Sequence, residues 1–152
     1  MVSEFDVTVV PQQPALSISK KIPATEIPSV VGAAFGKIEN YLKEIGEVPA
    51  GPPYIAYFND DMESLDMEIG LPVNHPVLGL NQIEANKTIG GRVASCIYKG
   101  PYSEIGEAYG ELTQFVKGKG LKTKGIACEI YLNDPAETLP EELLTKVMFV
   151  LE

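Results

Sequence analysis

The strongest constraint on the fold of this chain is an internal repeat that spans most of its length. The sequence Tyr-Phe-Asn-Asp at residues 57–60 recurs as Tyr-Leu-Asn-Asp at residues 131–134, an offset of 74 residues. The sequence at residues 23–27 has its counterpart at residues 101–105, at an offset of 78. The two offsets place about one extra helical turn between the anchors in the first half. Such a repeat predicts two similar modules related by a pseudo-two-fold axis, with a crevice between them.

Composition limits the class of protein. A chain of 152 residues can bury roughly two thirds of its extended surface, so no disulfide or metal is needed to hold a core. The net charge of −9 argues against direct binding of nucleic acid, which needs clustered Lys and Arg. Cys96 and Cys128 lie in apolar runs and form no CxxC motif, so free buried thiols and no metal or other cofactor are expected. The sequence contains no signal peptide and no run of about 18 apolar residues, which predicts a cytoplasmic protein without membrane association.

Hydrophobic periodicity predicts strand, helix, strand and strand in each half. Thr25 and Ser103 are expected to cap the two helices. Residues 5–10 and 15–21 are predicted to form one interrupted strand or two short strands. The other predicted strands are residues 54–58, 65–73, 92–98, 126–132 and 146–151, and the predicted helices are residues 26–45 and 104–117, with a short helical turn at 140–144. The prediction is an α+β fold, a single domain over residues 1–152 with repeats at about 5–73 and 91–152 and a linker at 74–90.

The strand at residues 126–132 holds the candidate site. Its side chains alternate between two faces, one aliphatic and one carrying Ala127, Glu129 and Tyr131. If the aliphatic face covers the helices, Glu129 and Tyr131 point to the opposite face. The matching first-half positions are Pro53, Ile55 and Tyr57, and Ile55 aligns with Glu129.

Together these residues predict an apolar pocket with one carboxylate, which is the usual make-up of a small-molecule site. In a dry pocket the pKa of that carboxylate should be raised. The alternative is that Glu129 lies on a solvated face of the sheet and has no function.

Four motifs carry a resemblance to a known family: residues 91–93 (Gly-Arg-Val), 100–102 (Gly-Pro-Tyr), 128–135 (Cys-Glu-Ile-Tyr-Leu-Asn-Asp-Pro) and 140–143 (Pro-Glu-Glu-Leu). They resemble the GyrI-like family, which includes effector-binding domains of AraC-type and MerR-type activators. The resemblance implies a concave antiparallel sheet with two helices on its convex face and a ligand, often aromatic or cationic, on the concave face. It implies that Glu129 lies at the floor of the pocket, and Tyr98 and Tyr102 are further expected ligand contacts.

Three functions follow as alternatives. The first is binding or sequestration of a lipophilic, aromatic or cationic small molecule, as in multidrug-binding domains of transcription regulation, here expected without a DNA-binding domain. The second is hydrolysis of strained electrophilic rings, with Glu129 as general base and Tyr131 as its partner. The third is regulation of a protein partner, as in gyrase inhibitors. The oligomeric state is left open.

Overall fold

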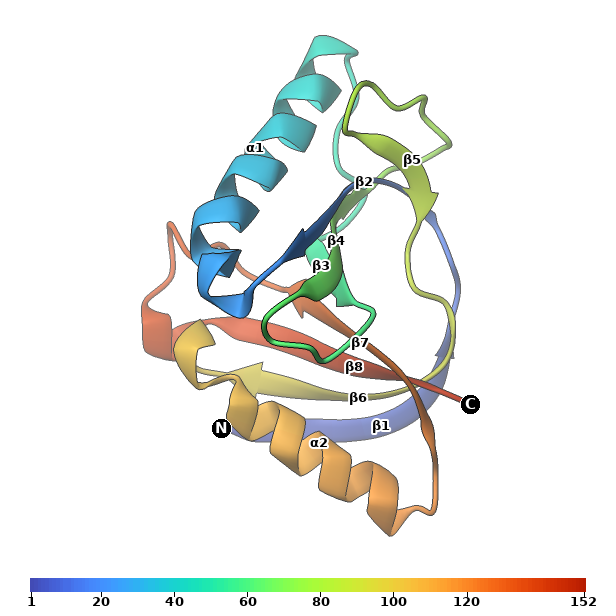
Figure 1. The fold of residues 1–152 in the computed structure, drawn as a ribbon, viewed down its shortest axis with the longest axis vertical. Helices are drawn as coiled ribbons and strands as arrows, with labels where there is room; N and C mark the ends of the chain where they lie inside the picture. Colours follow the sequence, from blue (N-terminus) through green and yellow to red (C-terminus); the bar gives the residue numbers. More distant parts are fainter. The chain divides into compact units, whose positions relative to one another are not determined.

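The computed structural model describes residues 1–152 and has an α+β fold, with antiparallel strands and two α-helices (Figure 1). The predicted fold class is therefore confirmed. The chain divides into two compact units, Gln12–Ile89 and Met1–Pro11 with Gly90–Glu152. Neither α-helix is long and apolar enough to cross a membrane.

The unit Gln12–Ile89 contains one α-helix and four strands in the order β3-β4-β2-β5. Its elements are β2 (Pro14–Ile22), the 3-10 turn η1 (Ala24–Glu26), α1 (Ile27–Glu44), β3 (Tyr54–Tyr57), β4 (Leu65–Pro72) and β5 (Glu84–Lys87). The helix lies against β4 and β2 and buries Ala34, Ile38 and Leu42, which recur at spacings of four residues.

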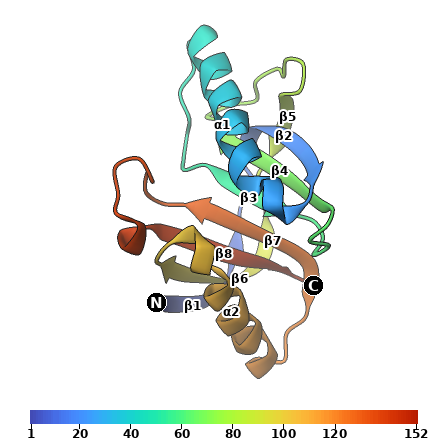
Figure 2. The same ribbon diagram turned by 60° about the vertical axis from the view of Figure 1, so that its left-hand side comes forward.

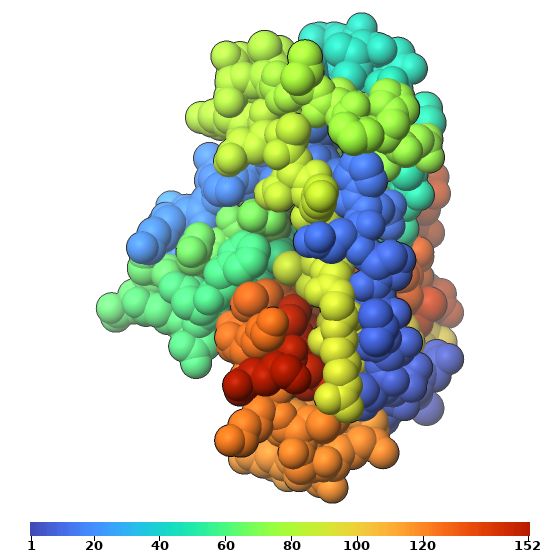
Figure 3. All heavy atoms as spheres, turned by 90° about the vertical axis from the view of Figure 1, so that its right-hand side faces the viewer, coloured from blue at the N-terminus to red at the C-terminus, as the bar shows by residue number.

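The second unit has the corresponding strand order β1-β6-β8-β7. Its elements are β1 (Val2–Val10), β6 (Gly91–Lys99), η2 (Tyr102–Glu104), α2 (Gly106–Gly118), β7 (Thr123–Tyr131), η3 (Pro140–Glu142) and β8 (Leu144–Leu151). Helix α2 packs on β6 and β1 (Figure 2) and buries Ala108, Leu112 and Val116. The space-filling view shows the start of β6, in yellow, beside β1, in blue (Figure 3), in agreement with the pairing of Val10 with Gly91.

Both units therefore contain the same succession of strand, helix, strand and strand, which is β2-α1-β3-β4 in one and β6-α2-β7-β8 in the other. In each succession the last strand, β4 or β8, lies between the other two. The extra turn of helix expected in the first half is found in α1, which has 18 residues where α2 has 13.

Two strands differ from the sequence predictions. β1 was expected to belong with the first half, but it pairs with β6. The Pro-Gln-Gln-Pro break at residues 11–14 separates β1 from β2, because proline has no N–H to continue a strand ladder. The predicted linker contains β5, a short polar strand that pairs with the edge of β2. Only four residues long, β5 shows too little alternation to be recognised from sequence.

The predicted helix caps are wrong. Neither Thr25 nor Ser103 makes a capping hydrogen bond, because each helix is entered through a 3-10 turn that begins at a proline. Pro23 and Pro101 have extended backbones, with ψ of 150° and 148°. Each proline carbonyl accepts the N–H of the residue three positions on, at 2.9 and 3.1 Å. The repeated sequence at these positions therefore encodes the same turn twice.

The repeated asparagine also has the same role in both units. Asn59 donates from Nδ2 to the carbonyl of Ser64 at 3.0 Å and accepts the N–H of Asp66 at 2.9 Å. Asn133 makes the matching pair of bonds across the loop between β7 and β8, at 3.1 and 2.9 Å. The Asn of the repeat is therefore a structural clamp that closes the loop between two neighbouring strands.

Replacing Asn59 or Asn133 by alanine is expected to lower the free energy of unfolding by about 1–3 kcal/mol, because each change leaves a backbone N–H and a carbonyl without their partner. Urea denaturation measures the loss. Asp60→Ala, at an exposed position beside the clamp, is the control and should change stability by less than about 0.5 kcal/mol. Equal effects of Asn59→Ala and Asp60→Ala would contradict the structural role.

Candidate functional site

Glu129 on β7 has a buried carboxylate that accepts a hydrogen bond at each of its two oxygens. The residue is 8% exposed. The hydroxyl of Tyr131, two residues along the strand, donates to Oε1 at 2.8 Å. The hydroxyl of Tyr109, on α2, donates to Oε2 at 2.5 Å. Two phenol donors therefore hold the carboxylate in one orientation, and such charge-assisted bonds are stronger than neutral ones.

The expectation that Glu129 points away from the helices is wrong, because its partner Tyr109 belongs to α2. The strand register agrees, since Glu129 lies opposite Val147 on β8, and Val147 lies opposite Cys96 on β6. Val147 and Cys96 both belong to the core that α2 covers. The apolar stripe of α2 lies over β6 and β1. β7 lies two strands away from β6, outside the apolar stripe of α2. The helix-facing side of β7 can therefore carry a polar residue, and Tyr109 reaches Glu129 there.

Each tyrosine that bonds this carboxylate packs against a further aromatic ring. The rings of Tyr102 and Tyr131 meet edge to face, with centroids 5.5 Å apart at an interplanar angle of 69°. The rings of Tyr109 and Phe149 are 5.7 Å apart at 49°. Edge and tilted contacts of this kind are the favoured geometries of aromatic pairs. We refer to Glu129, Tyr102, Tyr109, Tyr131 and Phe149 as the Glu129 cluster.

Burial dominates the electrostatics of the cluster. It raises the pKa of Glu129 above its usual value of 4.5, and the hydrogen bonds from Tyr109 and Tyr131 lower the pKa by less than burial raises it. The pKa of Tyr102 is also raised, first by burial and then by the negative charges of Asp134 and Glu129. The predicted rise in the pKa of Glu129 therefore agrees with the structure.

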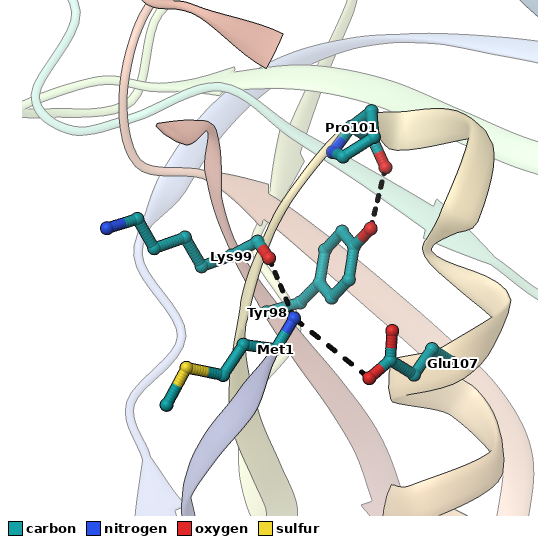
Figure 4. Close-up of polar contacts among 5 residues, drawn as sticks. All are labelled: Met1, Tyr98, Lys99, Pro101 and Glu107. Carbon is teal, nitrogen blue, oxygen red and sulfur yellow. Dashed lines mark hydrogen bonds and ion pairs between the residues drawn. The ribbon is translucent and has the colours of Figure 1, made fainter. Parts of the chain in front are cut away.

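Two other predicted contacts lie in the same unit. Ala127 is half-buried and lies opposite Phe149 in the register of β7 and β8, on the face that carries Glu129. Tyr98 is 1% exposed in the core beneath α2, and its hydroxyl donates to the carbonyl of Pro101 at 2.8 Å (Figure 4). That geometry gives Tyr98 a structural role at the turn into α2.

The start of β1 contacts the end of β6 and helix α2 close to Tyr98. The terminal ammonium group of Met1 donates to the carbonyl of Lys99 at 2.9 Å and lies 4.0 Å from the carboxylate of Glu107 on α2 (Figure 4). These groups are largely exposed, so the ion pair adds little to stability.

The predicted first-half contacts lie in the unit Gln12–Ile89. Ile55 is 1% exposed and pairs with Ile69 of β4, and Pro53 and Tyr57 are half-buried. The role of Pro53, Ile55 and Tyr57 as ligand contacts stays a prediction.

Sequence reasoning missed two members of the cluster, Tyr109 and Phe149. Tyr109 falls on the apolar stripe of its helix and reads there as a core residue. A signal was present, because a buried tyrosine hydroxyl needs a hydrogen-bond partner, and the predicted face of residues 126–132 carries the carboxylate of Glu129, which is the stronger of its two acceptors. Phe149 gave no such signal.

A family model matches nearly the whole chain. A model described as the GyrI-like small-molecule binding domain matches residues 3–152. The chain belongs to this family. The resemblance seen in the sequence motifs is thereby confirmed. No match is found among curated proteins.

Solved structures share the fold at low sequence identity. The C-terminal domain of EcmrR is 18% identical with a TM-score of 0.76, over 100% of this chain and 99% of that one. EcmrR in complex with DNA is 18% identical with a TM-score of 0.84, and the match covers 98% of this chain but only 57% of that one. SAV2435 bound to tetraphenylphosphonium is 9% identical with a TM-score of 0.65, over 98% and 94% of the two chains. A structure described as a hydrolase from Listeria innocua is 16% identical with a TM-score of 0.70, over 99% and 92%.

Proposed function

We propose that this chain binds lipophilic cations and that Glu129 is the carboxylate against which the positive charge is held. The observation that carries the proposal is a buried carboxylate bonded by two tyrosine hydroxyls and bordered by further aromatic rings. Aromatic faces attract cations, and the attraction strengthens where water is excluded.

The physical reason for a preference for cations lies in the cost of burying the carboxylate. Burial destabilises the charged form of Glu129, as its raised pKa indicates. A cation placed beside the carboxylate removes part of that cost, whereas a neutral ligand of the same shape does not. The cluster therefore favours a positive charge by an amount that depends on Glu129.

The comparisons support a small-molecule ligand without naming it. The family is one of small-molecule binding domains, and SAV2435 was solved with a lipophilic phosphonium ion. The likeness to EcmrR, solved on DNA, supports a role for the ligand as the effector of a regulator. Because the chain has a net charge of −9, we assign its role to binding the ligand and not to contact with nucleic acid.

Isothermal titration calorimetry of the purified protein with tetraphenylphosphonium and with neutral triphenylphosphine oxide tests the proposal. Saturable binding of one phosphonium ion per chain, tighter than that of the neutral compound, is the expected result. Binding of neither compound, or equal binding of both, would overturn it.

Hydrolysis of a strained electrophilic ring is the second candidate. A carboxylate of raised pKa is suited to accept a proton from water, and the hydroxyls of Tyr109 or Tyr131 could donate to the opening ring. A similar structure is described as a hydrolase. Incubation with epoxide- or cyclopropane-bearing compounds tests this candidate, and turnover that survives Glu129→Ala would remove Glu129 from the mechanism.

A further inference from the structure

Thr145 on β8 has a buried hydroxyl with no hydrogen-bond partner. The residue is 0% exposed, and its Oγ1 makes no hydrogen bond. In the strand register Thr145 lies between two tyrosines, opposite Tyr98 of β6 and opposite Tyr131 of β7. Neither tyrosine hydroxyl bonds to it, since that of Tyr98 donates to Pro101 and that of Tyr131 donates to Glu129.

An unpaired hydroxyl in this position is unfavourable in the ligand-free protein. Burying a hydroxyl without a hydrogen-bond partner costs free energy, whereas burying an apolar group of the same shape does not. Valine has nearly the shape of threonine and would fill the same space among Tyr98, Val147 and Tyr131. The hydroxyl of Thr145 therefore contributes nothing visible to the ligand-free fold.

Thr145 lies next to the Glu129 cluster, where its hydroxyl is positioned to bond a ligand. Thr145 and Val147 are two residues apart on β8 and so share a face, and Val147 lies directly opposite Glu129. Thr145 is thus a diagonal neighbour of Glu129, within the reach of one small molecule. On β7 the residue directly opposite Thr145 is Tyr131, whose hydroxyl donates a hydrogen bond to Oε1 of Glu129.

We propose that Thr145 is the second hydrogen-bonding group of the ligand site and that it recognises ligands with an N–H or O–H group beside their positive charge. This inference rests on the proposed function. A cation that approaches Oε1 of Glu129 competes with the hydroxyl of Tyr131. Displacement of Tyr131 uncovers the hydroxyl of Thr145, which then accepts the N–H or O–H of the ligand. The preferred ligand is accordingly a protonated amine and not a quaternary ion.

The test compares two matched ions, a protonated diphenylmethyl tertiary amine, which has one N–H, and its N-methyl quaternary salt, which has none. Their affinities are measured by calorimetry for the wild type, Thr145→Val and the control Thr145→Ser, which keeps the hydroxyl. We expect Thr145→Val to weaken the tertiary amine by about tenfold and to leave the quaternary salt unchanged. Thr145→Ser should retain most of the preference for the amine. The ligand-free Thr145→Val protein should have a melting temperature equal to or above that of the wild type.

The outcomes separate this inference from the proposed function. If the wild type binds both ions and Thr145→Val weakens neither, or weakens both equally, the role of Thr145 is overturned while the proposed function stands. A clear drop in the melting temperature of ligand-free Thr145→Val would also overturn it, because the hydroxyl would then stabilise the empty protein. If the wild type binds neither ion, the proposed function fails and the inference fails with it.

Discussion

Replacing Glu129 by glutamine is expected to weaken the binding of tetraphenylphosphonium by about 1–3 kcal/mol, the range for a lost interaction with a buried charged group. Glutamine keeps the size and shape of the side chain and removes its charge, and its amide NH2 replaces one of the two oxygens that accept a tyrosine hydroxyl. The binding of neutral triphenylphosphine oxide should therefore change little. Calorimetry of both compounds with both proteins measures the difference.

Glu137→Gln is the matched control, because it removes one negative charge from an exposed loop residue of the same unit. It should leave the affinity for the phosphonium ion nearly unchanged at physiological salt, where charges on the surface are screened. An equal loss in Glu129→Gln and Glu137→Gln would mean that net charge, and not the buried site, attracts the cation. An equal loss for the charged and the neutral compound would mean that the substitution disturbs the packing of the Glu129 cluster.

The ligand-free protein should lose stability relative to Glu129→Gln as the pH rises. Burial raises the pKa of Glu129 in the folded protein above its usual value of 4.5, so the folded state holds the proton more tightly than the unfolded state. The stability contributed by this group is present below about pH 4.5 and is lost as the pH rises through the folded pKa. Above that pKa the difference between the two proteins should be constant.

Urea denaturation of both proteins at a series of pH values from 4 to 8 measures this difference, whose slope for one proton cannot exceed about 1.4 kcal/mol per pH unit. Comparison with Glu129→Gln cancels the contributions of other groups, among them Glu68, whose pKa is raised mainly by burial. A difference that stays flat across the range, or one in which the wild type gains stability with rising pH, would contradict a raised pKa for Glu129.

Much of the fold was predictable because hydrophobic periodicity is a local signal. Both helices were predicted within one or two residues of their ends, since α1 buries residues four apart and Gly46, with φ of 74°, terminates it. The Pro motif and the Asn motif of the repeat each form the same local structure in both units. The pairing of β1 with β6 was not predictable in this way, because pairing depends on partners far apart in the sequence.

The candidate site was predictable only in part. Alternation along the strand placed Glu129, Tyr131 and Ala127 on one face, and the register of β7 and β8 agrees. Alternation could not decide which face the helix covers, because α2 lies over β6 and β1 and not over the strand that carries Glu129. Helical periodicity places Tyr109 on the apolar stripe of α2, where its ring packs against the core, but it does not show that the hydroxyl donates to Glu129.

The most direct test of Glu129 as the anion for the ligand is the carbon-detected NMR signal of its carboxyl group, followed through a pH titration with and without saturating tetraphenylphosphonium. A cation held beside the carboxylate stabilises its charged form, so the pKa of Glu129 should fall when the ligand is bound, and its Cδ signal should move at constant pH. A protein that is saturated with the phosphonium ion while the pKa and Cδ signal of Glu129 stay unchanged would contradict the account.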